Sequence, residues 1–302
     1  DSTVEFGDPA LVGWTFQGWF LAAEGGTAVT SVVMDDVNGK TLYAHWKADE
    51  YKLTFNGNKP ANASNNVTSV PTATPVAYDS TVDTFDTPAL VGWAFQGWYT
   101  AADSTGSKVE TPYKYVTVGN VTLYAHWEAN TYTVSFDANG GALASGTTPI
   151  TVTFDLPYGT LAATPTWKGW VFQGWTLEKD NKDTIVTSST KVVTAKAHTL
   201  YAYWTPKTGI TVTLVLDGGS VTGDVTSVQV QFTGSYADLL AIEPTKTGYD
   251  FAGWFLDEAF ANEITAETTV ENADDHYAYA KYDPHKYNVE FVDAKFNTTV
   301  PG

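Results

Sequence analysis

The chain of 302 residues contains no cysteine and only one methionine, Met34. It can therefore form no disulfide and no thiolate metal site, and its folded parts must be held together by packing alone. No stretch approaches the roughly 20 consecutive apolar residues of a membrane-spanning helix. The opening residues are too polar for a secretory signal peptide. We expect no membrane insertion within these residues, so an export signal or an anchor would lie outside them.

Arginine is also absent, so all 16 basic residues are lysines. The 34 acidic residues outnumber them and give a formal net charge of −18. Nucleic acids and anionic membrane surfaces bind clustered cations, which this composition does not supply. The sequence therefore argues against nucleic acid as a partner and favours a soluble, self-repelling surface.

Aromatic residues, in contrast, make up 14% of the sequence and recur in a fixed pattern. One motif of six residues begins with an aromatic residue and ends in Gly-Trp, as in Trp14-Thr-Phe-Gln-Gly-Trp19. Its copies occupy residues 14–19, 93–98, 170–175 and 249–254, and their final tryptophans are 79, 77 and 79 residues apart. Self-similarity at a fixed period identifies a tandem array of small modules.

A second motif, Thr-Leu-Tyr-Ala-x-Trp, follows at residues 41–46, 122–127 and 199–204, and in a weaker form at 276–282. Apolar and polar residues alternate in segments such as Tyr51-Lys-Leu-Thr-Phe55, which predicts half-buried strands. The expected fold class is mainly β with short helices (α+β). The best helix candidate spans residues 235–242, with Ser235 as its N-cap.

The two motifs also set the expected domain boundaries. Joints of about four residues, such as Lys47–Glu50, restrict how far neighbouring modules can swing. A module of about 75 residues should measure roughly 30 Å, so four in line predict an elongated array near 120 Å. The modules are 1–46, which lacks its leading strands, 51–127, 132–204 and 209–282, and the opening strand of a further repeat lies in 287–302.

Residues that occupy the same place in every module are typical of a repeated hydrophobic core. Burying one large aromatic side chain stabilises a module by about 2–3 kcal/mol, so core packing explains these positions better than ligand binding. The predicted core signature consists of Phe16, Trp19, Trp46, Phe95, Trp98, Trp127, Phe172, Trp175, Trp204, Phe251 and Trp254.

Four other tryptophans are the candidates for stacking on a ligand: Trp14, Trp93, Trp167 and Trp170. We find no catalytic, cofactor-binding or metal-binding constellation. His45 and His126 have no ligand partners at a definite spacing, and a solvated strand position is expected for both. The acidic stretches at 35–38 and 180–183 match no calcium-loop pattern and are expected to be solvated loops.

The two motifs at this spacing resemble the Listeria–Bacteroides repeat, the module of internalin B-type B-repeats. The resemblance covers nearly the whole chain. It implies small β-grasp-like modules strung in tandem on secreted proteins of the bacterial cell surface, and it implies no catalytic residues. The chain departs from the family by placing Trp14, Trp93 and Trp170 where Tyr is common.

The phase of the repeat leaves two interpretations of the chain ends open. Asp1-Ser-Thr-Val matches Asp79-Ser-Thr-Val82, so the first module is expected to lack two strands. The stretch is either cut from a longer array, or the last strand of one chain completes the first module of the next. In the second case Tyr287, Val289 and Phe291 would donate that strand to a neighbouring copy.

These observations predict a non-enzymatic structural protein, the stalk or fibre of an extracellular bacterial surface protein. Its partners would be neighbouring copies of itself or further repeats of a longer chain. The alternative is an adhesin that binds a host glycan or protein through variable loops and exposed tryptophans.

Overall fold

The computed structural model describes residues 3–4, 6–30, 32–33, 39–290, 292–293, 295 and 298–299. Helix in this part is limited to α2 (Ala237–Leu240) and the 3-10 turn η1 (Lys182–Thr184), which confirms the mainly β fold. The chain forms two compact units: Asp1–Val134 with Ile150–Gly159 and Ser188–His198, and Ser135–Pro149 with Thr160–Thr187 and Thr199–Gly302.

The first unit begins with a small antiparallel sheet built from the two motifs of the first repeat. β2 (Trp14–Phe20) lies between β3 (Ala28–Val29) and β5 (Tyr43–Ala48). A register shift between Phe16 and Gly18 bends β2 where it pairs with β5. A separate pair joins β1 (Thr3–Val4) to β4 (Val32–Val33).

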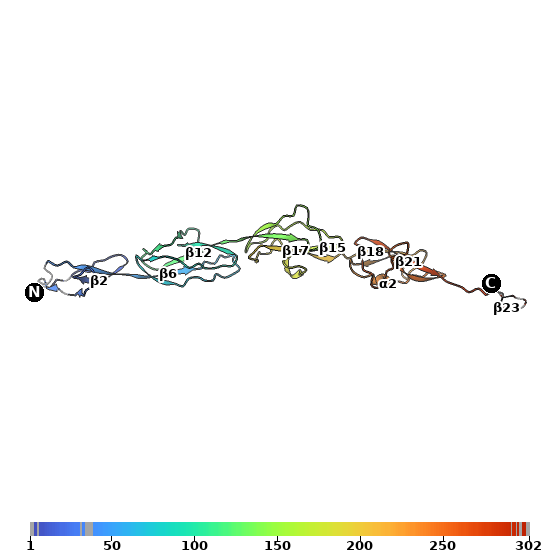
Figure 1. Cartoon of the computed structure of the whole chain (residues 1–302), viewed down its shortest axis with the longest axis horizontal. Coiled ribbons are helices and arrows are strands. Elements are labelled where there is room, and N and C mark those ends of the chain that lie inside the picture. The colour runs from blue at the N-terminus through green and yellow to red at the C-terminus, as the bar shows by residue number, and fades with distance from the viewer. Residues whose placement is uncertain are drawn as a thin grey trace. The chain divides into compact units, whose positions relative to one another are not determined.

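The second repeat of this unit is a five-stranded mixed sheet. Its strand order is β10-β9-β12-β6-β7, with β12 parallel to β6 and the other pairs antiparallel. Figure 1 labels β6 and β12. A further pair joins β8 (Thr81–Val82) to β11 (Tyr113–Lys114). The strands are β6 (Glu50–Asn56), β7 (Thr74–Ala77), β9 (Trp93–Tyr99), β10 (Lys108–Val109) and β12 (Val121–Ala129).

The core of the second repeat follows from the alternation of its strands. Leu123 and Ala125 on β12 point to the same face and are fully buried. Trp98 on β9 packs with them, and Phe55, Phe95 and Trp127 pack around this centre. The β period of two therefore places the motif residues on one side of the sheet.

The third repeat contributes to both units. β13 (Thr131–Asp137) runs from the first unit into the second, and within the first unit it pairs with β14 (Ile150–Thr153). In the second unit β15 (Trp170–Thr176) pairs with β16 (Ile185–Val186) and with β17 (His198–Pro206).

The fourth repeat, in the second unit, has the strand order β19-β18-β21-β20. Figure 1 labels β18 and β21. β18 is parallel to β21, as β6 is to β12. The strands are β18 (Ile210–Val215), β19 (Ser227–Val230), β20 (Tyr249–Phe255) and β21 (His276–Pro284). Farther along, β22 (Val292–Asp293) pairs with β23 (Thr298–Thr299).

The helix predicted at residues 235–242 is shorter than expected, and the prediction of its cap was wrong. Only α2 forms, its N-cap residue is Tyr236, and no side chain caps it. Tyr236 is buried and its hydroxyl pairs with Nε2 of His276 at 2.9 Å. Ser235 lies before the helix start, where it pairs with Thr269 in an isolated antiparallel bridge.

Candidate functional site: the joints between repeats

Neighbouring repeats are joined more tightly than the sequence predicts. β5 ends at Ala48 and β6 begins at Glu50, so Asp49 alone separates them. Asn130 alone separates β12 from β13, and residues 207–209 separate β17 from β18. The prediction of four-residue joints was therefore too long, because the strands continue up to the joint and pair there.

In each joint one linking residue forms two main-chain hydrogen bonds, one to each of the neighbouring repeats, and we call this pair of bonds the relay. In the first joint the N–H of Asp49 donates to the carbonyl of Gly13 at 2.9 Å. The carbonyl of Asp49 accepts from the N–H of Tyr78, the residue after β7, at 2.8 Å. One residue thus bonds to the motif of the repeat before it and to a strand end of the repeat after it.

The other two joints repeat this geometry. Asn130 donates to the carbonyl of Gly92 and accepts from the N–H of Phe154, both at 2.9 Å. Lys207 donates to the carbonyl of Gly169 at 2.9 Å and accepts from the N–H of Phe232 at 2.8 Å. The first two joints lie within the first unit and the third lies within the second.

An aromatic ring covers a glycine at the centre of each joint. A Cβ added to Gly13, Gly92 or Gly169 would lie 2.4, 2.2 or 2.5 Å from the nearest ring carbon, which belongs to Tyr78, Phe154 and Phe232 respectively. The three glycines have φ values of 78°, 78° and 82°, in the left-handed region. Glycine is therefore required at each of these positions for two reasons, the backbone conformation and the close approach of the ring.

The residue after each ring turns the chain back. Asp79, Asp155 and Thr233 have φ values of 62°, 61° and 61°, which is costly for residues with a side chain. Their N–H groups donate to the carbonyls of residues 115, 192 and 270 at 2.8, 2.9 and 2.8 Å. This bond fixes the turn that presents the ring to the preceding repeat.

The four candidate ligand tryptophans lie at or beside these joints. Trp14 meets Tyr78 edge-on at 6.4 Å between ring centroids, and Trp170 meets Phe232 edge-on at 6.1 Å. Trp167 stacks on Trp170 at 4.7 Å. Trp93 donates its indole N–H across the second joint, and all four side chains are half-buried.

The predicted core signature is placed inside the repeats. Trp98, Trp175, Trp204 and Trp254 are buried, and the other members are half-buried. Each motif phenylalanine meets the final tryptophan of its motif edge-on, with centroids between 5.4 and 5.7 Å apart. Three of the four final indole N–H groups donate to a loop carbonyl, and the partners are residues 86, 162 and 242.

The repeated motifs agree with a known family. The family model of the Listeria–Bacteroides repeat domain matches residues 1–45, 51–126, 132–203 and 211–281. The chain belongs to this family. The resemblance seen in the sequence is thereby confirmed, and the joints described above connect Listeria–Bacteroides repeats.

Among known proteins, the chain is similar to two from Evansella cellulosilytica and one from Listeria monocytogenes. One is named as a Gly-rich membrane protein and is 31% identical over 94% of this chain and 32% of its own length. Another, named as a membrane protein, is 29% identical over 83% of this chain and 34% of its own length. Internalin H is 31% identical over 40% of this chain and 20% of its own length. The chain thus spans about a third of the first two relatives.

The second joint between these Listeria–Bacteroides repeats contains a buried carboxylate. Asp155 is 2% exposed, and its Oδ2 accepts from the N–H of Ser64 at 3.1 Å and from Nε1 of Trp93 at 2.9 Å. Nζ of Lys191 lies 3.9 Å from Oδ1 and donates to the carbonyl of Asn62 at 3.1 Å. The sequence did not indicate this site, because its four residues are distant along the chain.

Two opposing effects act on the pKa of Asp155. Burial by itself raises it, since a carboxylate loses hydration in the joint. The hydrogen bonds from Ser64 and Trp93 and the charge of Lys191 outweigh burial and hold the pKa below its ordinary value. The joint therefore contains a carboxylate, not a neutral acid, at neutral pH.

The two strand histidines are half-buried and stacked on aromatic rings, so the prediction of a solvated strand position was incomplete. His45 stacks on Phe20 and His126 stacks on Tyr99, each with ring centroids 3.9 Å apart. Nε2 of each lies 3.0 Å from a loop carbonyl, of Ala22 or Ala101. The signal in the sequence was the aromatic residue directly after Gly-Trp in these two repeats.

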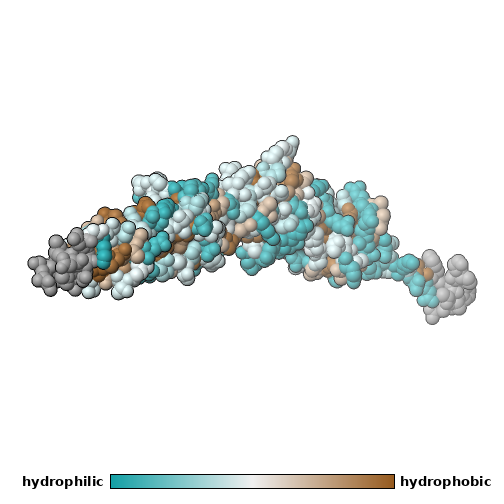
Figure 2. Space-filling model, turned by 60° about the vertical axis from the view of Figure 1, so that its left-hand side comes forward, coloured by the Kyte–Doolittle hydropathy of each residue, from teal (hydrophilic) through white to brown (hydrophobic). Residues whose placement is uncertain are grey.

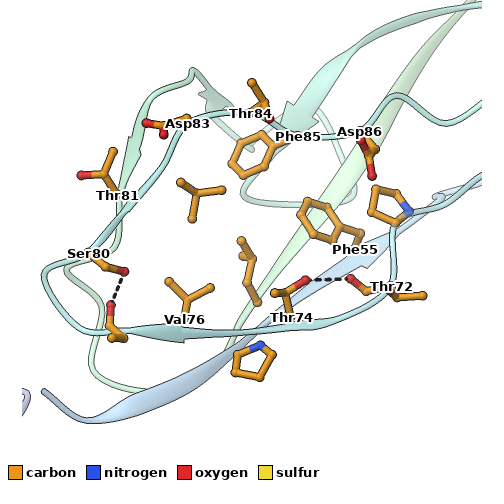
Figure 3. Close-up of a pocket in the computed structure, with 15 residues that line it drawn as sticks. Phe55, Thr72, Thr74, Val76, Ser80, Thr81, Asp83, Thr84, Phe85 and Asp86 are labelled. Carbon is orange, nitrogen blue, oxygen red and sulfur yellow. Dashed lines mark hydrogen bonds between the residues drawn. The ribbon is translucent and has the colours of Figure 1, made fainter.

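The second repeat also contains a cavity of about 740 Å³ beside β7. In Figure 3 Phe55 and Phe85 lie next to each other along it, and Val76 points in from β7. Ser80, Thr81 and further polar side chains surround the opening. The rings of Phe55 and Phe85 meet edge-on with centroids 5.6 Å apart, and the lining of this cavity mixes apolar side chains with hydroxyl and carboxylate groups.

The described residues hold no group of three or more His, Cys, Asp or Glu side chains that could bind a metal ion. Asp180 pairs with Asn139 at 2.9 Å and Asp183 pairs with Lys182, while Asp35 and Asp36 lie outside the described residues. Within the same part of the chain, no helix is both long and apolar enough to cross a bilayer. On the face seen in Figure 2, hydrophobic residues form small patches between hydrophilic ones.

The predicted strand donor has two described members. Tyr287 is 75% exposed and Val289 is 71% exposed, and neither belongs to a strand. The hydroxyl of Tyr287 lies 3.1 Å from Nδ1 of His285. Phe291 lies outside the described residues.

Proposed function

We propose that the chain is a spacer, the stalk segment of a bacterial cell-surface protein, whose repeats are held in fixed register by their joints. The observation that carries this proposal is the recurrence of one joint three times, with the same relay and the same ring on the same glycine. A flexible tether needs none of these contacts. Two anchored strands and a packed ring oppose bending at each joint.

Several observations support the surface location and the structural role. The chain belongs to the Listeria–Bacteroides repeat family, and its relatives include an internalin and proteins named as membrane proteins. A net charge of −18 keeps such a segment soluble and discourages aggregation between segments. We further propose that each complete repeat is a β-grasp-like module, since in the second and fourth repeats the first and last long strands lie parallel in the middle of the sheet.

The rigidity of a joint can be measured directly because the chain has no cysteine. Gln17 and Gln96 are exposed and occupy equivalent positions in the first and second repeats. Spin labels on Gln17→Cys and Gln96→Cys should give one narrow distance distribution by pulsed electron resonance. The control carries Gly-Gly-Ser-Gly inserted after Asp49, which interrupts the relay and should broaden the distribution. Equal widths in the two proteins would refute the rigid-spacer proposal.

The rival function, an adhesin for a host glycan or protein, has its best support in the cavity of the second repeat. Its mixed lining of apolar side chains and hydroxyl groups suits a ligand with both apolar and polar surfaces (Figure 3). A glycan array probed with the chain tests it. Binding that Phe85→Ala abolishes would favour the adhesin over the pure spacer.

We also keep head-to-tail association by strand donation as a proposal. It is supported by the accessibility of Tyr287 and Val289. Sedimentation velocity should show self-association that disappears when residues 287–302 are deleted. An unchanged distribution of species after the deletion would exclude this mode of assembly.

A further inference from the structure

The fourth repeat contains a joint face built like the other three. Gly248 has a φ of 81°, close to the 78°, 78° and 82° of the three joint glycines. The N–H of His285 donates to its carbonyl at 2.9 Å, which is the first bond of the relay. Tyr249 follows Gly248 as a tryptophan follows each of the other joint glycines. We call Gly248, Tyr249 and His285 the fourth face.

In the part of the chain that the structure describes, no ring covers the glycine of the fourth face. A Cβ on Gly248 would have no described atom within 4 Å, whereas rings approach the other three positions within 2.5 Å. Tyr249 is 40% exposed. Nζ of Lys246 lies 4.8 Å from the centroid of Tyr249 and helps to hold this ring in place. The fourth face therefore has the backbone conformation of the other joints, but no described ring lies on its glycine.

The three occupied faces show what kind of group fits. Each receives a Tyr or Phe that follows the second strand of a repeat and precedes a residue with positive φ. A second copy of the chain has no spare ring of this kind in its described repeats, because Tyr78, Phe154 and Phe232 are all engaged in their own joints.

We propose that the fourth face receives the Tyr or Phe of a further Listeria–Bacteroides repeat, with His285 as the linking residue. The inference rests on the proposed spacer function, because it extends the same joint to a fourth position. The carbonyl of His285 would accept the N–H of the incoming aromatic residue, and the ring would lie on Gly248. The partner is therefore defined by the Tyr or Phe that follows its second strand, and not by its surface charge.

The test compares two alanine substitutions in two proteins. The first protein is the 302-residue chain. The second is an extended chain in which residues 1–285 are followed by a second copy of residues 131–302, so that His285 takes the place of Asn130. Gly248→Ala is compared with Gly223→Ala, because Gly223 has a φ of 80° and also has no atom within 4 Å. The two substitutions then cause the same backbone strain, and in the extended chain only position 248 would also meet an incoming ring.

In the 302-residue chain the two substitutions should lower the melting temperature equally. In the extended chain Gly248→Ala should lower it several degrees further than Gly223→Ala. Hydrogen exchange should show the His285 amide and the added Phe154 amide more protected in the extended chain than in its Gly248→Ala variant. Equal effects of the two substitutions in the extended chain, or an added copy that stays unprotected, would overturn the inference.

Two more results separate the possible failures. Gly169→Ala in the 302-residue chain tests an occupied joint, and an effect no larger than that of Gly223→Ala would undermine the spacer proposal itself. A costly Gly169→Ala with a neutral Gly248→Ala in the extended chain would overturn only the present inference. Self-association of the 302-residue chain that Gly248→Ala abolishes would assign the face to a second copy instead.

Discussion

Trp93 donates its indole N–H to Oδ2 of Asp155 at 2.9 Å, although the two residues belong to different repeats. The bond makes the second joint unlike the others, because the residues equivalent to Asp155 are exposed in the first and third joints. The loop that contains Asn62 and Ser64 closes over the carboxylate and explains the difference. All three joints contain the same relay and the same ring on a glycine, and the second joint has additional hydrogen bonds to a buried carboxylate.

The stability of the second joint should depend on pH. The folded pKa of Asp155 lies below its unfolded value of about 3.9, so its contribution is fully present above that value and is lost as the pH falls through the folded pKa. Asp155→Asn should cost about 1–3 kcal/mol at pH 7, and the difference from the native chain should shrink below about pH 4. Urea unfolding between pH 3 and pH 7 measures this.

The matched control for Asp155 is Asp79→Asn, at the equivalent position of the first joint. Asp79 is exposed and forms an ion pair with Lys114 at 2.8 Å. Exposed ion pairs contribute about 0–1 kcal/mol, so this substitution should change stability little. An equal cost for the two substitutions would contradict a special role for the buried carboxylate.

Gly92→Ala should destabilise the chain more than Gly223→Ala. Both residues have positive φ, which costs about 1–2 kcal/mol for a side chain in the left-handed region. Only Gly92 also meets a ring, since its Cβ would lie 2.2 Å from Phe154. Overpacking should add about 1–3 kcal/mol, measured as the difference in unfolding free energy between the two variants.

Phe154→Ala should be more costly than Phe232→Ala. Phe154 is fully buried, and Phe→Ala in a core costs about 3–5 kcal/mol. Phe232 is half-buried, so it loses less contact. Chemical unfolding gives both values, and a larger loss for Phe232 would mean that burial does not set the strength of the joint.

Ligands that stack on tryptophan should not quench the fluorescence of the chain in a saturable way. Trp14, Trp93, Trp167 and Trp170 are half-buried at or beside joints, so a sugar ring would have to displace a packed partner. The measurement is the tryptophan fluorescence of the chain during titration with the glycans of the array. Saturable quenching that Trp14→Phe removes would support the adhesin function instead.

The sequence predicts the period, the strands and the family well, because each depends on local patterns that recur four times. It does not predict the joints, because they join a glycine such as Gly92 to a ring such as Phe154 far along the chain. A signal was present, however. A glycine precedes the first aromatic residue of every motif copy, and an aromatic residue follows the second strand in three repeats. Only the fold shows that the two meet.

Other differences have local causes. The sequence predicts solvated motif histidines because strand alternation places them on the outer face of the sheet. The pattern does not show that Phe20 and Tyr99, the last residues of β2 and β9, stack on the imidazoles from the neighbouring strand, or that the loop after each strand brings a carbonyl to the same ring. The helix predicted at 235–242 begins only at Ala237, because Ser235 pairs with Thr269 in an antiparallel bridge and is not free to start the helix.

The linking residues of the relay are Asp49, Asn130, Lys207 and, on the fourth face, His285. An acid, an amide, an amine and an imidazole serve one purpose because only their main-chain groups enter the relay. Recombination between copies therefore need not preserve any particular side chain at the seam. A gene built on such joints can gain or lose whole repeats and still encode a chain whose neighbours dock.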